Sequence, residues 1–241
     1  MAASETLPIE FGRKTLAALA RAAQAGGRFD EMYGFAKRMV TAARAQLSAE
    51  ELDLVAAALA GVVESGQRTW RALVADGPPR EQEVAAYVQM LRAELEGHAL
   101  TWQTQVAALL ASHPPPDHAV LFQRLAGDQY AALAELAPDR RDAYAGKAAA
   151  AYDQALRTAV DKLAPTHPLR LGVVLNYAVC EYELLAKHEQ AIARAKRAFD
   201  EAIGKLDRLD AASAKVVTPL VQALRDQLIL WTSDPPLAAS D

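Results

Sequence analysis

The sequence predicts an all-α fold, and three observations support this. Hydrophobic residues make up 52% of the 241 residues, yet aromatic residues make up only 6% and much of the remainder is alanine. Alanine has the highest helix propensity, whereas the β-branched and aromatic residues that favour strands are sparse. Apolar residues also recur at helical spacing between clear stop signals. We expect about nine helices, and short connections make antiparallel packing of neighbours the rule.

The first part of the chain predicts four helices, with bounds of about 8–26, 29–46, 48–75 and 80–112. Gly26-Gly27 ends the first of them. Ser48 followed by Glu51 forms a capping box that opens the third. The turn 76–79, Asp-Gly-Pro-Pro, ends the third helix, and the prolines 114–116 follow the fourth.

Five further helices are expected, with bounds of about 117–138, 139–163, 166–186, 189–206 and 210–234. Asp117 is expected to begin the fifth helix, and Asp139 to cap the sixth. In the last helix Pro219 lacks a backbone donor and would clash with the preceding turn. A kink or a restart is therefore expected, with Thr218 as the N-cap. With no linker in sight, residues 1–234 are expected to form a single domain and residues 235–241 a short tail.

The charge balance limits the partners. The chain has 26 basic and 30 acidic residues and a net charge of −4, which argues against nucleic acid or an anionic membrane as partner. The single cysteine, Cys180, rules out an internal disulfide framework and fits a reducing compartment. The N-terminus lacks a signal-peptide core, and the most apolar stretch, 55–63, is about half of a membrane span. We therefore expect a cytoplasmic protein.

No motif for catalysis, a metal or a cofactor can be recognised. None of the histidines has a partner at metal-ligand spacing: His98, His113, His118, His167 and His188. Gly26-Gly27 is not followed by a phosphate-loop pattern. Glu50-Glu51 lies at a helix N-terminus, where negative charge is favourable without any catalytic role. The sequence predicts no enzyme.

Several strings carry a resemblance to a known family. They are Pro165-Thr-His-Pro-Leu-Arg-Leu-Gly172, Leu175-Asn176, Ala198-Phe-Asp-Glu-Ala-Ile203, Leu206-Asp207, Leu224-Arg-Asp226 and Leu230-Trp-Thr-Ser-Asp234. The chain resembles 14-3-3 proteins through these strings and, more loosely, through Arg28-Phe-Asp-Glu-Met32, Thr69-Trp-Arg71 and Gly127-Asp128. The resemblance implies a cup-shaped bundle of nine antiparallel helices that dimerises. It also implies an amphipathic groove for an extended protein or peptide ligand, which usually carries phosphoserine or phosphothreonine.

The spacing of one set of residues fits the apolar wall of such a groove. Leu175, Asn176, Val179 and Glu183 recur on one helix face, and Ala223, Gln227 and Trp231 recur on another. Periodicity alone favours a core position for such stripes, whereas the resemblance favours a groove. The resemblance implies that the following residues contact the peptide: Leu175, Asn176, Val179, Glu183, Gln227, Leu230 and Trp231. Gln227 stands where the family has a second asparagine, and Ala223 where it has leucine.

The phosphate pocket departs from the family. There the phosphate is held by a lysine, two arginines and a tyrosine, a donor set that suits a dianion. The resemblance places Ala60, Gln67, Ala131 and Ala132 at these four positions. Positive charge remains nearby at Arg68, Arg71 and Arg124. Because charge-assisted hydrogen bonds contribute roughly 1.5–3 kcal/mol each, phosphate-dependent binding is expected to be absent or very weak.

Some of the residues that form the dimer interface in the family are also present in this chain. Arg28, Tyr87 and Glu94 match interface positions of the family, and Arg28 and Glu94 match the two ends of one cross-subunit ion pair. Met90, however, stands in place of the lysine that would meet Glu31. A homodimer is expected.

Three functions are compatible with the sequence. The preferred one is an adaptor whose groove binds partner segments without requiring phosphate. The second is a phosphopeptide adaptor with an anion site rebuilt from Arg68, Arg71 and Arg124. The third is a structural dimer or oligomer scaffold in which the groove is vestigial.

Overall fold

The computed structural model describes residues 11–42, 47–75 and 81–233. Some predicted features lie outside the described residues: the start of the first helix at Pro8, the end of the second at 46, the turn 76–79, the start of the fourth at 80, the end of the last at 234 and the tail 235–241. In the described part of the chain every regular element is helical, which confirms the all-α fold. There, no helix is both long and apolar enough to cross a membrane.

The α-helices occur in the predicted order. They are α1 (Arg13–Ala25), α2 (Phe29–Thr41), α3 (Ala49–Val74), α4 (Gln82–Ala111), α5 (Pro116–Leu136), α6 (Arg141–Lys162), α7 (Pro168–Val179), α8 (His188–Leu206) and α9 (Ala211–Ser233). Two short elements separate them: the 3₁₀ helix η1 (Pro138–Arg140) before α6, and the π-helical turn η2 (Cys180–Leu184) after α7.

Local signals explain several boundaries. Both halves of the predicted capping box are present, since the Ser48 hydroxyl accepts from the Glu51 N–H and the Glu51 side chain accepts from the Ser48 N–H. Gly27 has a φ of +66°, which glycine adopts without strain and which lets the chain leave α1. His167 caps α7, because its Nδ1 accepts from the Leu169 N–H at 3.3 Å.

Two expectations about boundaries were wrong. Asp139 does not cap the sixth helix, because it lies within η1 and α6 begins two residues later at Arg141. The ninth helix does not restart at Pro219, since α9 continues through this residue from Ala211 to Ser233. Pro219 is exposed, so its ring lies on the outer face of α9, where solvent can hydrate the carbonyl that loses its partner.

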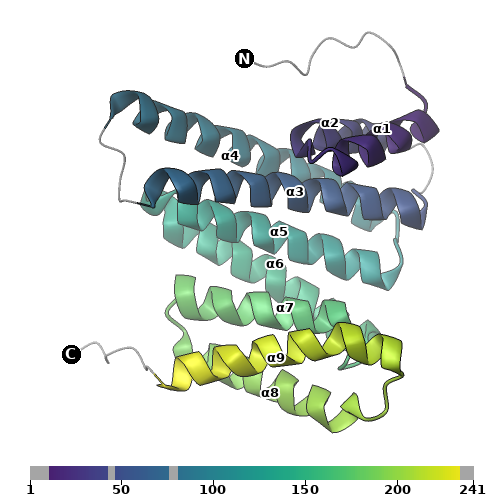
Figure 1. The fold of residues 1–241 in the computed structure, drawn as a ribbon, viewed down its shortest axis with the longest axis vertical. Coiled ribbons are helices and arrows are strands. Elements are labelled where there is room, and N and C mark those ends of the chain that lie inside the picture. Colours follow the sequence, from purple (N-terminus) through teal and green to yellow (C-terminus); the bar gives the residue numbers. More distant parts are fainter. Residues whose placement is uncertain (1–10, 43–46, 76–80, 234–241) are drawn as a thin grey trace.

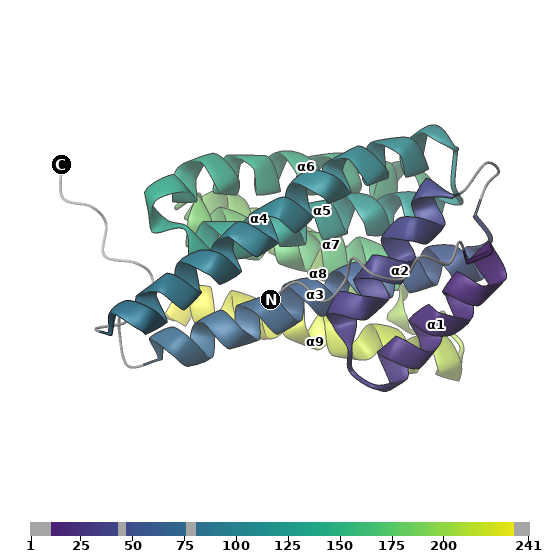
Figure 2. The same cartoon turned by 90° about the horizontal axis from the view of Figure 1, so that it is seen from above.

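The helices are stacked from α1 and α2 at one end of the molecule to α8 and α9 at the other (Figure 1). In this view α3, α5, α7 and α9 lie in front of α4, α6 and α8. Figure 2, seen from above, shows α3 and α9 along one side of the molecule and α6 along the opposite side. The helices α3, α5, α7 and α9 therefore share one side, and the groove described below lies among them.

The core is divided into two main clusters. One joins α1 to α6, and the other joins α7, α8 and α9. Alanine makes up much of the second cluster, since Ala178, Ala191, Ala195 and Ala202 are all fully buried. Such small side chains let helix axes approach closely, which explains why so alanine-rich a sequence forms a packed bundle.

Close packing at Gly127 generates a stability prediction. A Cβ at this position on α5 would lie 2.5 Å from Cε1 of the buried Tyr152 ring, whereas a Cβ at the exposed Gly97 of α4 would meet nothing within 4 Å. We expect Gly127→Ala to lower the free energy of unfolding by about 1–3 kcal/mol through overpacking. Gly97→Ala, the matched control, should raise it by about 0.5–1 kcal/mol through helix propensity. Urea denaturation measures both, and equal stabilisation by the two variants would contradict the packing described here.

Candidate peptide-binding groove

Two adjoining pockets form a groove on the side that α3, α5, α7 and α9 share. The first, of about 680 Å³, is lined from α5, α6, α7, η2 and α9. The second, of about 300 Å³, is lined from α3, α5, α6 and α7. Ala131, Tyr152 and Asn176 line both, so the two pockets are parts of one depression.

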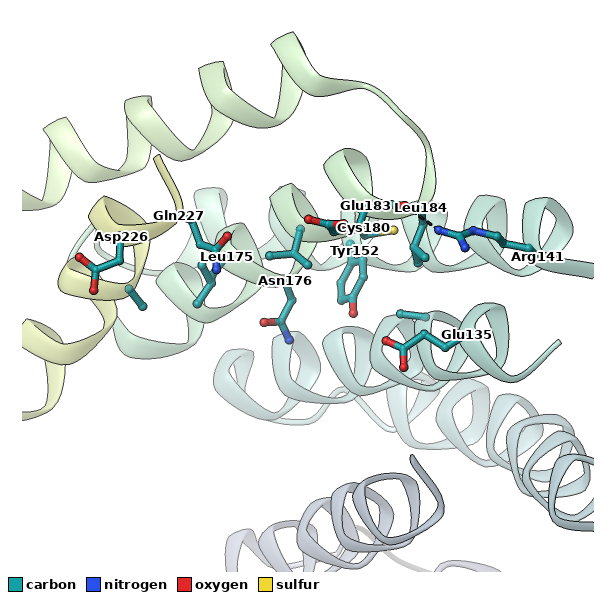
Figure 3. A pocket seen from close by; sticks show the side chains of 13 residues that line it. Glu135, Arg141, Tyr152, Leu175, Asn176, Cys180, Glu183, Leu184, Asp226 and Gln227 are labelled. Atoms are coloured by element: carbon teal, nitrogen blue, oxygen red, sulfur yellow. Dashed lines mark hydrogen bonds between the residues drawn. The ribbon is translucent and has the colours of Figure 1, made fainter. Parts of the chain in front are cut away.

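The first pocket contains most of the predicted apolar wall (Figure 3). Its lining includes Leu175, Asn176, Val179, Glu183 and Gln227. In Figure 3, Leu175 and Asn176 belong to α7, Gln227 to α9, and Glu135 lies across the pocket on α5. The spacing argument therefore identified side chains that lie together around one cavity.

Two predicted wall residues lie elsewhere. Trp231 is only 2% exposed, and its ring stacks on Tyr182 with a centroid separation of 4.5 Å, so it belongs to the core of α7, α8 and α9. Leu230 is 58% exposed and lines neither pocket. Trp231 does lie on the same face of α9 as Gln227, but Tyr182 of η2 covers its indole ring. Periodicity cannot detect such a contact.

The second pocket lies where the resemblance places the phosphate. Ala60, Gln67 and Ala131 line it, together with apolar side chains of α3 and α5. Ala132, the fourth predicted position, is 3% exposed and lines neither pocket. Three of the four predicted phosphate positions therefore line the cavity, and the side chains at all three are uncharged.

The remaining basic residues are not gathered in one place. Arg124 lines the second pocket, and its Nη1 lies 3.9 Å from Oδ2 of Asp128. Arg71 forms an ion pair with Glu135 at 2.9 Å, and Arg68 is exposed and lines neither pocket. Only one of the three arginines named for a rebuilt anion site therefore faces the cavity.

Asp128, which lines the second pocket, forms the centre of a hydrogen-bond network. Its Oδ1 accepts from the Tyr152 hydroxyl at 2.7 Å and from Nδ2 of Asn176 at 2.8 Å, so it links α5 to α6 and α7. Burial, followed by the charge of Asp128, raises the pKa of Tyr152 well above its usual value. The phenol therefore stays protonated as the donor. The Gly127-Asp128 string carries part of the family resemblance, but the sequence alone indicated no role for Asp128 or Tyr152.

A buried ion pair fixes the turn next to the groove. Glu181 of η2 is 2% exposed and accepts from Nε and Nη2 of Arg194 on α8, at 2.8 and 2.7 Å. The guanidinium also lies over the Tyr177 ring, 4.0 Å from its centroid. This bidentate contact orients the π-helical turn that presents Glu183 to the first pocket.

The chemistry of the groove is that of a binding site. Cys180 lines the first pocket, but burial raises the pKa of its thiol to about 11, so the nucleophilic thiolate is scarce at neutral pH. Among the described residues, no three histidine, cysteine, aspartate or glutamate side chains are grouped so that they could hold a metal ion. The groove presents apolar surface, side-chain amides and carboxylates, with one arginine in each pocket.

The predicted interface residues lie away from the groove. Tyr87 and Met90 of α4 are 45% and 56% exposed, and Glu94 is exposed on the same helix. Arg28 forms an ion pair with Glu31 within its own chain. The neighbouring surfaces of α2 and α4 thus present both apolar and charged side chains.

The described helices form an all-α bundle, and a half-buried asparagine and apolar side chains border its groove, as is typical of helical proteins that bind peptide segments. Comparison with known proteins identifies the family. The model of the 14-3-3 protein family matches residues 19–232. A 14-3-3-like protein of Nicotiana tabacum is 37% identical over 226 residues, which cover 90% of this chain and 89% of the relative. The 14-3-3 protein zeta of Xenopus laevis is 36% identical, with 89% and 91% covered. The chain belongs to the 14-3-3 family, whose members are adaptors that bind protein partners.

The Asp128 network generates a second prediction. Asp128→Ala removes the acceptor of the buried Tyr152 hydroxyl and should lower the free energy of unfolding by about 1–3 kcal/mol. Tyr152→Phe removes the hydroxyl itself. In the double variant no unpaired hydroxyl remains, so its loss of stability should be smaller than the sum of the two single losses. Urea denaturation of the four proteins measures this coupling, and strict additivity would contradict the network.

Proposed function

We propose that this 14-3-3 family member binds partner segments in its groove without requiring phosphoserine or phosphothreonine. One observation carries the proposal: Ala60, Gln67 and Ala131 line the cavity where the family places phosphate-binding side chains. A dianionic phosphate needs several charged donors to replace its hydration, and three neutral side chains supply none.

The nearby arginines support this proposal rather than a rebuilt anion site. Arg71 already pairs with Glu135, and Arg124 shares the second pocket with Asp128. The loss of three cationic partners corresponds to about 4.5–9 kcal/mol, which exceeds the roughly 4.1 kcal/mol that separates a micromolar ligand from a millimolar one.

The first pocket supplies the contacts that an unphosphorylated segment would use. Leu175 and Val179 are half-buried and offer apolar surface. The amide nitrogen of Asn176 is committed to Asp128, which leaves its carbonyl oxygen to accept from a peptide N–H. An extended segment, which exposes N–H groups along its length, fits this arrangement.

A rebuilt anion site is the second candidate, and one feature favours it. Nε of Arg124 is buried and has no hydrogen-bond partner among the described residues. A phosphate that entered the second pocket could accept from it. Asp128 lies beside the same guanidinium and would repel that phosphate.

The wider proposal is a non-enzymatic, cytoplasmic homodimer formed by a single domain over residues 1–234. Arg28, Tyr87 and Glu94 would lie at the dimer interface. Arg28 would then exchange its contact with Glu31 for Glu94 of a second copy. The exposed apolar surface of Tyr87 and Met90 supports this assignment.

Matched peptides test the phosphate independence. Two fluorescent peptides, identical apart from a phosphate on one serine and set in a context that 14-3-3 proteins recognise, are titrated by fluorescence polarisation. The wild-type protein should bind the two with affinities within about threefold of each other. The variant Ala60→Lys/Gln67→Arg/Ala131→Arg should prefer the phosphopeptide by at least about 100-fold, because it regains charged donors. A tenfold or greater preference by the wild-type protein would overturn the proposal.

A further inference from the structure

The charges that line the groove have the opposite balance from a phosphate site. Glu64 and Asp128 line the second pocket together with a single arginine, Arg124. Three carboxylates line the first pocket together with a single arginine: Glu135, Glu183 and Asp226 with Arg141. In both pockets negative side chains outnumber positive ones.

Two of these carboxylates already have an arginine as an ion-pair partner. Arg71 pairs with Glu135 from outside the first pocket, and Arg225 lies 3.5 Å from Asp226. By contrast, Glu64 and Glu183 are exposed, and neither has an ion-pair partner among the residues that the structure describes. These two side chains therefore keep their charge free for a ligand.

Arg141 does not neutralise Glu183. Its Nη2 donates to the backbone carbonyl oxygen of Glu183 at 2.7 Å and not to the carboxylate. In Figure 3 the Arg141 side chain extends toward the end of the π-helical turn at the edge of the pocket. The guanidinium thus holds the turn, and the carboxylate that the turn carries stays available.

The second pocket also has room for the stem of a long basic side chain. Leu59, Ala60, Val63 and Leu125 give it apolar walls, and its volume is about 300 Å³. Lysine and arginine bury their methylene stems along apolar surface while the charged head reaches a polar group. Oδ1 of Asp128 is occupied by Tyr152 and Asn176, but the nearest partner of Oδ2 is Arg124 at 3.9 Å.

We infer that the groove selects an unphosphorylated, extended partner segment with a lysine or arginine side chain, which enters the emptied phosphate pocket toward Asp128 and Glu64. The inference rests on the proposed function and adds the chemistry of the partner. Charge complementarity sets the preference, since a cation is attracted where a phosphate would meet two carboxylates. The same position thus changes from anion recognition to cation recognition.

Selection from a displayed library of random, unphosphorylated twelve-residue peptides tests this inference. The wild-type protein is used for selection, and the Leu175→Ser variant for counter-selection. That variant weakens the apolar wall without adding charge. Circular dichroism melting verifies that it folds. Peptides that depend on the groove should be enriched in lysine or arginine.

Binding constants of one selected basic peptide then locate the cation. Its basic residues are replaced one at a time by norleucine, and at one position this should weaken binding by about fivefold or more. The Glu64→Gln variant, which removes one charge from the second pocket, should weaken binding of the basic peptide by about threefold to fivefold and change binding of that norleucine peptide by less than about twofold. Asp200→Asn, which removes an exposed charge outside both pockets, is the matched control and should change neither.

The outcomes separate the inference from the proposed function. Groove-dependent peptides without basic residues, or a basic peptide unaffected by Glu64→Gln, would overturn the inference and leave phosphate-independent binding intact. A selection that yields no groove-dependent peptide from a folded wild-type protein would overturn the proposed function as well. Equal loss with Asp200→Asn would mean that the overall negative charge of the protein, and not the groove, attracts basic peptides, which also overturns the inference.

Discussion

The hydrogen bonds of Asp128 are the interaction on which the groove depends. This carboxylate lines the second pocket and joins α5 to Tyr152 of α6 and Asn176 of α7, two residues that line both pockets. The close approach of α5 and α6 at Gly127 brings the phenol within reach. The packing at Gly127 and the hydrogen bonds of Asp128 thus act together to orient Asn176 in the groove wall.

The network also changes what the groove can bind. In a pocket that holds several phosphate-binding cations, positive charges outnumber the negative charge of such a carboxylate. Here Ala60, Gln67 and Ala131 supply no charge, so Asp128 and Glu64 face the cavity with Arg124 alone. The loss of basic residues therefore does more than remove affinity for phosphate, because it leaves a cavity whose apolar walls and carboxylates suit a cationic side chain.

The sequence predicted the fold well because its signals are local. Alanine content, the Ser48 capping box and the glycine break after α1 each act within a few residues, and the structure contains all of them. Non-local contacts caused the errors. Trp231 follows the helical stripe of Gln227 but is buried against Tyr182 of η2, and Ala132 faces the interior although its neighbour Ala131 lines the groove. Asp128 could be assigned a role only once α6 and α7 were placed beside it.

The central claim is that the former phosphate position has no useful affinity for a phosphorylated ligand. Nuclear magnetic resonance tests it most directly, through the backbone amides of Ala60, Gln67 and Ala131 during titration with phosphoserine. These three signals should stay unchanged up to about 10 mM ligand, because a pocket with one arginine and two carboxylates cannot replace the hydration of the phosphate. Saturable shifts of the three signals at micromolar concentrations would contradict it.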